Sequence, residues 1–257
     1  MSDRLSKPQR QERILERLGS DVTVRISTLA EQFDVTTETI RRDIDNLTDK
    51  GLVDRTYGGA ASRSLSSEPA MEQRRLKHVA ERERIGLHAA SLIDPGDVVM
   101  IDAGSTTLHF ARALASRDIE LTVLTNCLPA AYALGPVSRI RVMLCPGEFR
   151  ETEGGLYGEE TVAYLDRFSA NKAVISAGGI ASDGVTDVDF QASAVKRKMI
   201  ERATESILLL DHSKYDVRLF STVCHISQLD SVIVDSPPPR NLGLTIRDAR
   251  VQLLIAP

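Results

Sequence analysis

Polar residues that could bind a phosphorylated ligand follow one short apolar run in the middle of the sequence. The run Val98–Ile101 leads into Asp102, and Gly104-Ser105-Thr106-Thr107 then enters a predicted helix. Glycine permits a close approach of the backbone, while three hydroxyl groups and the free amides of a helix N-terminus form an anion site. Phosphate is the natural occupant of such a site, and the Asp102 carboxylate could accept hydrogen bonds from sugar hydroxyls. An ordinary capped turn between a strand and a helix is the alternative that this segment leaves open.

Further polar residues stand at the ends of other apolar runs, where open α/β sheets bind their ligands. Lys214 is the best candidate among them for a second phosphate or hydroxyl contact, because its ammonium group supplies a point charge. A solvated loop lysine is the alternative for this residue. The candidate ligand-binding residues are therefore Asp102, Gly104, Ser105, Thr106, Thr107, Asn126, Gly147, Thr186, Asp187 and Lys214.

A second group of residues that could bind a ligand lies near the N-terminus, on a predicted helix that begins after Thr36. Apolar residues recur along it at helical spacing and predict its buried stripe, namely Ile40, Ile44 and Leu47. The residues that flank this stripe near the start of the helix are Thr37, Glu38, Arg41 and Arg42. A helix-turn-helix protein meets base edges with this part of its second helix. A three-helix docking or dimerisation module with a solvated arginine pair is the alternative.

The neighbouring segments predict a helix-turn-helix with a wing. Residues 8–19 predict a first helix, Ile26–Phe33 predicts a second with Ser27 as its cap, and Gly51 ends the third. Residues 52–60 predict a small β-wing, from which Arg55 could reach a phosphate. The candidate DNA-binding residues are Thr36, Thr37, Glu38, Thr39, Arg41, Arg42 and Arg55.

The sequence after residue 97 alternates between short apolar runs and helical segments. The runs, which predict buried strands, are Val98–Ile101, Ile119–Leu124, Ile140–Leu144, Ala173–Ser176, Ile207–Leu210, Val232–Val234 and Val251–Ile255. The helical segments lie near Leu108–Ala115, Pro129–Leu134, Glu159–Phe168 and Ser193–Ala203. This alternation predicts an α/β domain with a mainly parallel sheet and right-handed crossovers.

A serine-rich stretch at residues 61–68 predicts a linker between two domains. We therefore expect a winged helix-turn-helix domain at residues 1–60 and a ligand-binding domain at residues 69–257. The second domain is predicted to open with a helix that begins near Pro69 and runs to about Ile93.

Composition excludes several classes of protein. It does not test the DNA-binding hypothesis, which rests on where particular charged residues lie. With 42% hydrophobic and 26% charged residues among 257, the chain is neither disordered nor collagen-like. No apolar stretch is long enough for a membrane helix, no signal core opens the chain, and the three cysteines and five histidines show no disulfide or metal spacing. We therefore expect a cytoplasmic protein with no membrane contact and no metal. The net charge of −4 gives no general sign of nucleic-acid binding, because a basic domain is absent.

Segments of the N-terminal part together resemble the signature of the DeoR family of bacterial sugar-metabolism repressors. The first segment spaces Arg10, Ile14 and Leu18 regularly, and the second is Thr36-x-x-Thr39-Ile40-Arg41-Arg42-Asp43-Ile44. The trailing segment, residues 51–60, is also similar to that family. The resemblance implies a winged helix-turn-helix that binds double-stranded operator DNA. It also implies a homo-oligomer, dimer or tetramer, because such proteins read repeated half-sites.

The resemblance continues through most of the remaining chain. The similar motifs are Asp102-x-Gly104-Ser105-Thr106-Thr107, Thr125-Asn126, Gly184-x-Thr186-Asp187 and Asp211-His212-Ser213-Lys214. The family's effector domain is similar in fold to ribose-5-phosphate isomerase, which implies a phosphorylated sugar as effector. The chain departs from the family pattern at Glu148, Asn171, Gln191 and Asp216, so the resemblance does not identify the sugar.

A sugar-phosphate isomerase-like enzyme with an appended DNA-binding module is the competing function. Isomerisation needs a carboxylate general base over the substrate carbon, and isomerases of this fold place a glutamate where this sequence has Lys196. We interpret the run Lys196-Arg197-Lys198 as a solvated helix face with no acidic partner for Lys196. Nucleotide-binding glycine loops and a nucleophile elbow are also missing. We therefore expect no enzyme and no cofactor, but a repressor of a sugar-utilisation operon that a phosphorylated sugar releases or re-poses.

Overall fold

Two separate hydrophobic cores form along the chain, one within its first 60 residues and one after residue 70. The computed structural model describes residues 5–20, 23–49, 52–56, 58–62, 71 and 76–257. The chain divides into an N-terminal unit, residues 1–67, and a C-terminal unit, residues 68–257. Of the predicted linker, residues 61–62 belong to a strand, and residues 63–68 lie outside the described residues.

Three helices build the core of the N-terminal unit. Their bounds are α1 Lys7–Ser20, α2 Ile26–Gln32 and α3 Thr37–Asp49. The predicted stripe of α3 is buried and packs with apolar side chains of α1 and α2, so that the core contains Ile14, Leu18, Leu29, Ile40, Ile44 and Leu47. Thr36 caps α3, because its hydroxyl accepts a hydrogen bond from the Thr39 amide at 3.2 Å. Ser27 does not cap α2, since that helix already begins at Ile26.

A three-stranded antiparallel sheet completes the N-terminal unit and supplies the predicted wing. Its strands are β1 Thr23–Arg25, β2 Val53–Thr56 and β3 Gly59–Ser62, in the order β1-β3-β2. β1 was not predicted. Gly59 pairs with Arg25, and a side chain at Gly59 would overlap the Val24 carbonyl. Glycine is therefore required at this position for β1 to join the hairpin.

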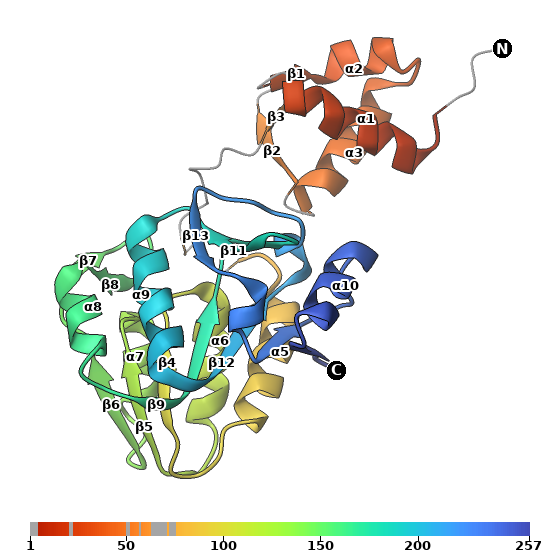
Figure 1. Ribbon diagram of the computed structural model, residues 1–257. Helices are drawn as coiled ribbons and strands as arrows, with labels where there is room; N and C mark the ends of the chain where they lie inside the picture. Colours follow the sequence, from red (N-terminus) through yellow and green to blue (C-terminus); the bar gives the residue numbers. More distant parts are fainter. Residues whose placement is uncertain (1–4, 21–22, 50–51, 57, 63–70, 72–75) are drawn as a thin grey trace. The chain divides into compact units, whose positions relative to one another are not determined.

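A seven-stranded parallel sheet forms the centre of the C-terminal unit, and all seven predicted runs contribute to it (Figure 1). Its order is β15-β14-β12-β9-β4-β5-β6. The bounds are β4 Val98–Ile101, β5 Leu121–Thr125, β6 Ile140–Leu144, β9 Ala170–Ser176, β12 Ala203–Leu210, β14 Ser231–Val234 and β15 Gln252–Ile255. The predicted α/β class is confirmed.

Helices cover both faces of this sheet. The bounds are α5 Val79–Ser91, α6 Ser105–Ala115, α7 Leu128–Leu134, α8 Glu159–Leu165, α9 Phe190–Arg202 and α10 Arg240–Asp248. α6 packs against both α5 and α7, whereas α9 packs against α8 on the opposite face (Figure 1). Within the described residues, none of the helices is long and apolar enough to span a membrane.

Several elements of the C-terminal unit were missed or misplaced. The small strands are β7 Glu148–Arg150, β8 Gly155–Tyr157, β10 Gly179–Ala181, β11 Gly184–Asp187 and β13 Ser221–Cys224. Helix α10 and two short 3₁₀ turns, η1 His212–Lys214 and η2 Ile226–Gln228, were also not predicted. The helix predicted from Pro69 to Ile93 is wrong as one continuous element. α5 begins only at Val79, because His78 before it has a φ of +52°, which breaks a right-handed helix.

We predict that Gly59→Ala destabilises the N-terminal unit by about 2 kcal/mol, because the added methyl group must push β1 away from β3. Calorimetry would measure this as a lower transition temperature of that unit. The matched control is Gly243→Ala in α10, where the added carbon meets no atom closer than 3.7 Å. The control should be neutral or slightly stabilising, since alanine favours helices. Equal melting of the Gly59 variant and the wild type would contradict the close β1–β3 approach.

Candidate functional site

The N-terminal half of α3 presents an exposed polar face. Thr37, Glu38, Arg41 and Arg42 are all exposed on it, and the Arg42 side chain is 79% exposed. The Glu38 carboxylate accepts a hydrogen bond from Arg41 at 3.0 Å and lies 3.4 Å from Nε of Arg42. Ion pairs at the surface contribute little stability. Both guanidinium groups can therefore exchange Glu38 for another anion at small cost.

The remaining predicted DNA-binding residues adjoin this face. The hydroxyls of Thr36 and Thr39 lie 2.9 Å apart and form one hydrogen bond at the start of α3. Arg55 on β2 forms an ion pair with Asp45 of α3, and both side chains are about half exposed. This ion pair joins the wing to α3 beside the exposed polar face of that helix.

Sequence reasoning missed the buried contact that orients α3. Arg10 of α1 forms an ion pair with Asp43 of α3, and both residues are almost fully buried. Gln11 donates a further hydrogen bond from its amide to Asp43 at 3.4 Å. Because this contact joins α1 to the side of α3 opposite the arginine face, it fixes which residues of α3 remain outside. Arg10 and Asp43 belong to the motif that resembles the DeoR family, and their role here is structural.

The second candidate site lies in the C-terminal unit, where the strand order changes direction. β4 and β9 are neighbours in the sheet, and the chain proceeds from β4 through β5 to β6, but from β9 through β12 to β15 on the other side. Open α/β sheets bind ligands in the crevice that forms at such a switch point, beyond the carboxyl ends of the strands. Asp102 follows β4 directly, and Ser176 ends β9. We use the term crevice for the group of residues around these two at this edge of the sheet.

Asp102 is engaged by the protein on both oxygens. Its Oδ1 accepts a hydrogen bond from the Ser176 amide at 3.1 Å, and its Oδ2 forms an ion pair with Nζ of Lys196. Both oxygens of Asp102 are thus engaged within the protein, so a sugar hydroxyl would have to share or replace one of these partners. Lys196 was misjudged, because it is only 4% exposed and has acidic partners.

Lys196 lies at the centre of a buried charge cluster. Its second partner is Asp187, whose Oδ2 is 3.6 Å from Nζ. Burial alone would lower the pKa of Lys196, but the attraction of Asp102 and Asp187 outweighs it and raises that pKa. The nearby Tyr157 hydroxyl is deeply buried, and burial raises its pKa, so it remains neutral. The cluster thus holds one cation against two carboxylates.

A signal for the burial of Lys196 was present in the sequence. The inward side of α9 is occupied at helical spacing by Ala192, Val195, Lys196 and Met199. Lys196 therefore continues an apolar stripe, which a solvated residue does not do. Arg197 and Lys198, its neighbours in the basic run, lie outside that stripe.

The start of α6 forms one wall of the crevice. Gly104 occupies the N-cap position and supplies no capping side chain, and a side chain there would overlap the Ser176 hydroxyl. Thr107, predicted as an anion ligand, instead donates its hydroxyl to the carbonyls of Asp102 and Gly104 at 2.9 and 3.1 Å. Ser105 and Thr106 remain as candidate ligands, together with the amides of the first helical turn.

Several other predicted ligand-binding residues hold the crevice walls together. The Asn126 amide group accepts a hydrogen bond from the Ala103 amide and donates one to the Leu156 carbonyl, both at 3.0 Å. The Thr186 hydroxyl accepts a hydrogen bond from the Leu219 amide at 3.0 Å. Gly147 has a φ of +140° and leaves no room for a side chain beside Thr161. These residues fix the shape of neighbouring loops.

The Asp211-His212-Ser213-Lys214 motif lies beyond β12, two strands from β4 and so roughly 10 Å away from Asp102. Asp211 is fully buried and pairs with Arg82 of α5 at 2.9 Å, a contact that sequence reasoning missed. Burial would raise the pKa of Asp211, but the charges of Arg82 and Lys214 hold it well below its usual value. Lys214 is 8% exposed, so the alternative of a solvated loop lysine is wrong.

We predict that Asp102→Ala lowers the free energy of unfolding by about 3–5 kcal/mol, because it leaves the buried Lys196 charge with Asp187 alone. Urea unfolding of the full chain would measure the loss. The double variant Asp102→Ala, Lys196→Met removes both charges of the pair and should be less destabilised than the sum of the two single variants. Strict additivity of the two losses would show that the pair is not coupled.

Comparison with known proteins takes in both units of the chain. Residues 10–65 match the model of the DeoR-like helix-turn-helix domain, and residues 77–236 match that of the DeoR C-terminal sensor domain. The glycerol-3-phosphate regulon repressor of Escherichia coli K12 is 32% identical over 97% of this chain and 99% of its own. The lactose phosphotransferase system repressor of Streptococcus mutans is 29% identical over 90% of this chain and 93% of its own.

A solved structure was also found at low similarity. The ribose 5-phosphate isomerase A of Methanocaldococcus jannaschii aligns with 54% of this chain and 55% of its own, at 16% identity and a TM-score of 0.41. This distant likeness carries no conclusion about catalysis. The two family matches and the near full-length relatives show that this chain belongs to the DeoR family of helix-turn-helix transcriptional regulators.

Proposed function

We propose that this protein represses a sugar-utilisation operon, and that a phosphorylated sugar bound in the crevice releases it from, or re-poses it on, its operator. The observation that carries the proposal is the face of α3 on which Arg41 and Arg42 stand exposed outside a buried stripe. Support comes from relatives whose names describe repressors of a glycerol-3-phosphate regulon and of a lactose phosphotransferase system. The protein acts in the cytoplasm, where its DNA target lies.

In this proposal α3 enters the major groove of double-stranded operator DNA. Arg41 and Arg42 leave Glu38 and contact base edges or phosphates, for which a planar guanidinium group is well suited. The hydroxyls of Thr36 and Thr39 at the helix N-terminus donate to a phosphate, and Arg55 exchanges Asp45 for another. Basic and acidic residues balance within residues 1–67, but this is no obstacle, because Arg41 and Arg42 stand exposed on α3 and Arg55 on the adjoining wing.

The phosphorylated sugar occupies the crevice with its phosphate at the start of α6. Ser105, Thr106 and the first helical amides bind the phosphate oxygens. The added negative charge competes with Asp102 for the Lys196 ammonium group, and this frees an Asp102 oxygen for a sugar hydroxyl. Lys214, which lies beyond β12, contacts the far end of the ligand. The switch requires that the ligand binds one conformation better than the other, since equal affinity would shift nothing.

The crevice is better suited to binding than to catalysis. A general base must reach the substrate proton with an unoccupied oxygen. Asp102 follows β4 at the switch point, and Ser176 and Lys196 engage both of its oxygens before a ligand binds. The oxygen that a ligand frees is then occupied by a sugar hydroxyl. Lys196, held protonated by two carboxylates, cannot accept a proton either. We therefore propose that the protein has no isomerase activity and needs no cofactor.

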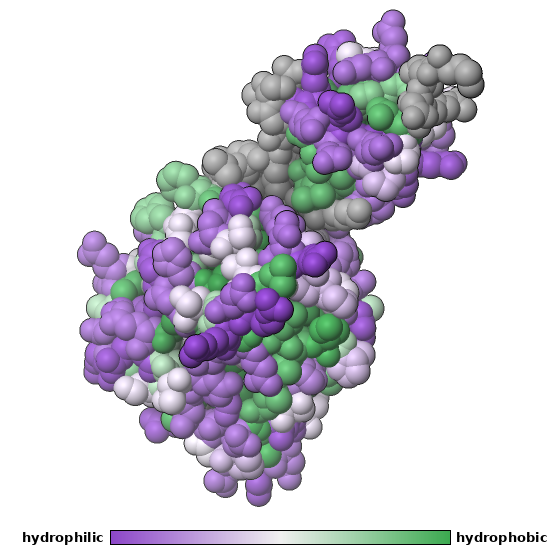
Figure 2. Space-filling view, turned by 45° about the vertical axis from the view of Figure 1, so that its right-hand side comes forward, coloured by the Kyte–Doolittle hydropathy of each residue, from purple (hydrophilic) through white to green (hydrophobic). Residues whose placement is uncertain are grey.

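The protein functions as a homo-oligomer, dimer or tetramer, because one helix-turn-helix unit reads only a half-site. Large apolar side chains stand exposed on the C-terminal unit, among them Phe190 and Phe220. Figure 2 shows hydrophobic surface among hydrophilic residues on that unit. Exposed apolar surface is available for contacts between subunits.

We predict that Arg41→Ala and Arg42→Ala each weaken operator binding without unfolding the protein. Both side chains lie outside the core of the unit, and each lost base or phosphate contact costs about 1–3 kcal/mol, or roughly 5- to 150-fold in affinity. Fluorescence anisotropy with labelled operator measures the affinity, and thermal melts confirm the fold. Arg247→Ala, an exposed arginine of α10, is the control. If both variants bind like the wild type, α3 is not the recognition helix.

A second prediction concerns the effector. Lys214→Met should retain operator affinity but respond to roughly 10- to 150-fold higher concentrations of sugar phosphate, because a charge-assisted hydrogen bond is lost. Arg82 still neutralises Asp211 in this variant, so the fold should survive. A thermal-shift panel of sugar phosphates, free sugars and inorganic phosphate identifies the effector, and operator release is then titrated. Lys198→Met on the outer side of α9 serves as control. An unchanged dose response would place the ligand away from Lys214.

A further inference from the structure

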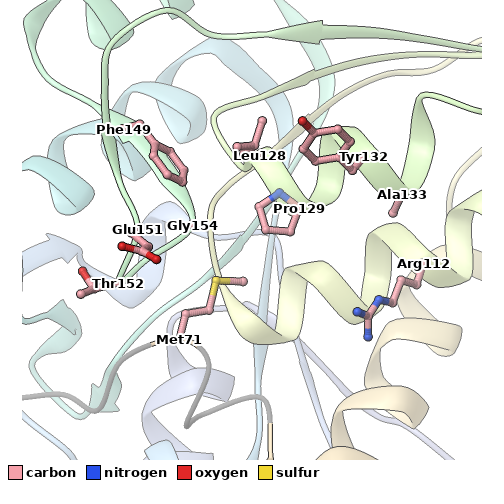
Figure 3. Close-up of a pocket in the computed structure, with 10 residues that line it drawn as sticks. All are labelled: Met71, Arg112, Leu128, Pro129, Tyr132, Ala133, Phe149, Glu151, Thr152 and Gly154. Atoms are coloured by element: carbon pink, nitrogen blue, oxygen red, sulfur yellow. The ribbon is translucent and has the colours of Figure 1, made fainter.

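A cavity of about 720 Å³ lies in the C-terminal unit, apart from the residues that form the crevice (Figure 3). α6 and α7 form its floor and one side, and the turn between β7 and β8 closes the other side. Met71 forms part of the wall near the start of α6. The lining residues are Met71, Arg112, Leu128, Pro129, Tyr132, Ala133, Phe149, Glu151, Thr152 and Gly154. Ligand sites in proteins commonly enclose roughly 300–1,000 Å³, so the cavity has the size of a small-molecule site.

The walls of this cavity are fixed by backbone contacts. The Gly154 amide bonds to the Glu151 carbonyl at 3.1 Å, and the Gly154 carbonyl accepts a hydrogen bond from the Leu128 amide at 3.0 Å. These bonds tie the turn between β7 and β8 to the start of α7. Gly154 has a φ of +62° and approaches Met71 and Pro129 closely. The cavity is therefore a preformed part of the fold.

Apolar and charged groups are separated along the cavity. Leu128, Pro129 and Phe149 form an apolar centre, while Arg112 and Glu151 stand at opposite ends (Figure 3). Within the described part of the chain, neither Arg112 nor Glu151 forms an ion pair. Exposed charges without partners at the two ends of an apolar pocket are available to a ligand of matching polarity.

We infer that this cavity is a second ligand site, which takes a small organic anion with a flat apolar body. The anionic group binds Arg112, the apolar body packs between Pro129 and Phe149, and a hydrogen-bond donor at the far end meets Glu151. A simple sugar phosphate suits the cavity poorly, because its hydroxyl groups would face apolar walls and lose their hydration. The cavity thus selects a chemistry different from that of the crevice.

Met71 links the wall of the cavity to the turn between β7 and β8. Met71 is 3% exposed, and its amide donates a hydrogen bond to the Thr152 carbonyl at 2.7 Å. A ligand in the cavity would lie against Met71 and Thr152 and so add contacts on both sides of this hydrogen bond.

The 2,6 isomer of anilinonaphthalene sulfonate is a suitable probe, because its sulfonate and its amine donor stand at opposite ends of an apolar naphthalene ring. The chain contains no tryptophan, so the probe's fluorescence is not excited by energy transfer from that residue. We expect one probe molecule per chain, bound with blue-shifted emission by the folded full-length protein. Arg112→Met keeps the apolar stem but removes the charge, and it should weaken binding roughly fivefold and reduce its dependence on salt. Ala133→Phe fills the cavity and should abolish binding.

Arg247→Met on α10 is the matched control and should bind the probe like the wild type. Thermal melts exclude binding to unfolded protein, and the exposed Arg112 position keeps the test valid if Ala133→Phe does not fold. The inference would be overturned if the wild type bound no stoichiometric probe molecule. It would also be overturned if Arg112→Met and Ala133→Phe both bound the probe as tightly as the wild type. Displacement of the probe by a crevice-binding sugar phosphate would also overturn it, since the probe would then occupy the crevice.

Discussion

The buried ion pair between Lys196 and Asp102 is the contact on which the crevice depends. Removing two charges from water is costly, and their attraction repays that cost only where geometry and further hydrogen bonds are good. Here the Ser176 amide binds the other oxygen of Asp102, and Asp187 adds a second carboxylate beside the lysine. The pair joins α9 to the end of β4, and so joins the helices of one face to the switch point of the sheet.

This cluster also sets the electrostatic condition under which a ligand enters. It carries one positive and two negative charges, which alone would repel a phosphate. In the proposed binding mode the N-terminus of α6 offsets this repulsion, because helix N-termini attract anions and Gly104 provides no side chain to cap this one. Phosphate binding there would also require a redistribution of partners around Lys196. Such an exchange between two arrangements of charges is a physical basis for two conformations with different affinities for one ligand.

The sequence predicted elements correctly where apolar residues recur in a regular pattern. It did not predict the role of a residue where a single side-chain contact determines that role. Val98–Ile101 was predicted to the residue, because a strand buried on both faces is continuously apolar. Ile140–Leu144 was also predicted to the residue, although it is an edge strand that is only partly buried. Strands β7, β8, β10, β11 and β13 were missed, because each is short and mixes glycine or polar residues with few apolar ones. Asn126 looked like a ligand because polar residues at strand ends often are, yet it bridges two backbone segments. Only the partner groups, which the sequence does not show, distinguish these roles.

The recognition surface and the crevice are formed by residues of different units, and this separation limits how a ligand can act on DNA binding. α3 is oriented from within its own unit by Arg10 and Asp43, so no change in the crevice is needed to form the recognition surface. The crevice is likewise assembled from C-terminal elements alone. In the proposed function, an effector therefore leaves the fold of each unit intact and shifts the population of states in which the recognition surface is available to DNA.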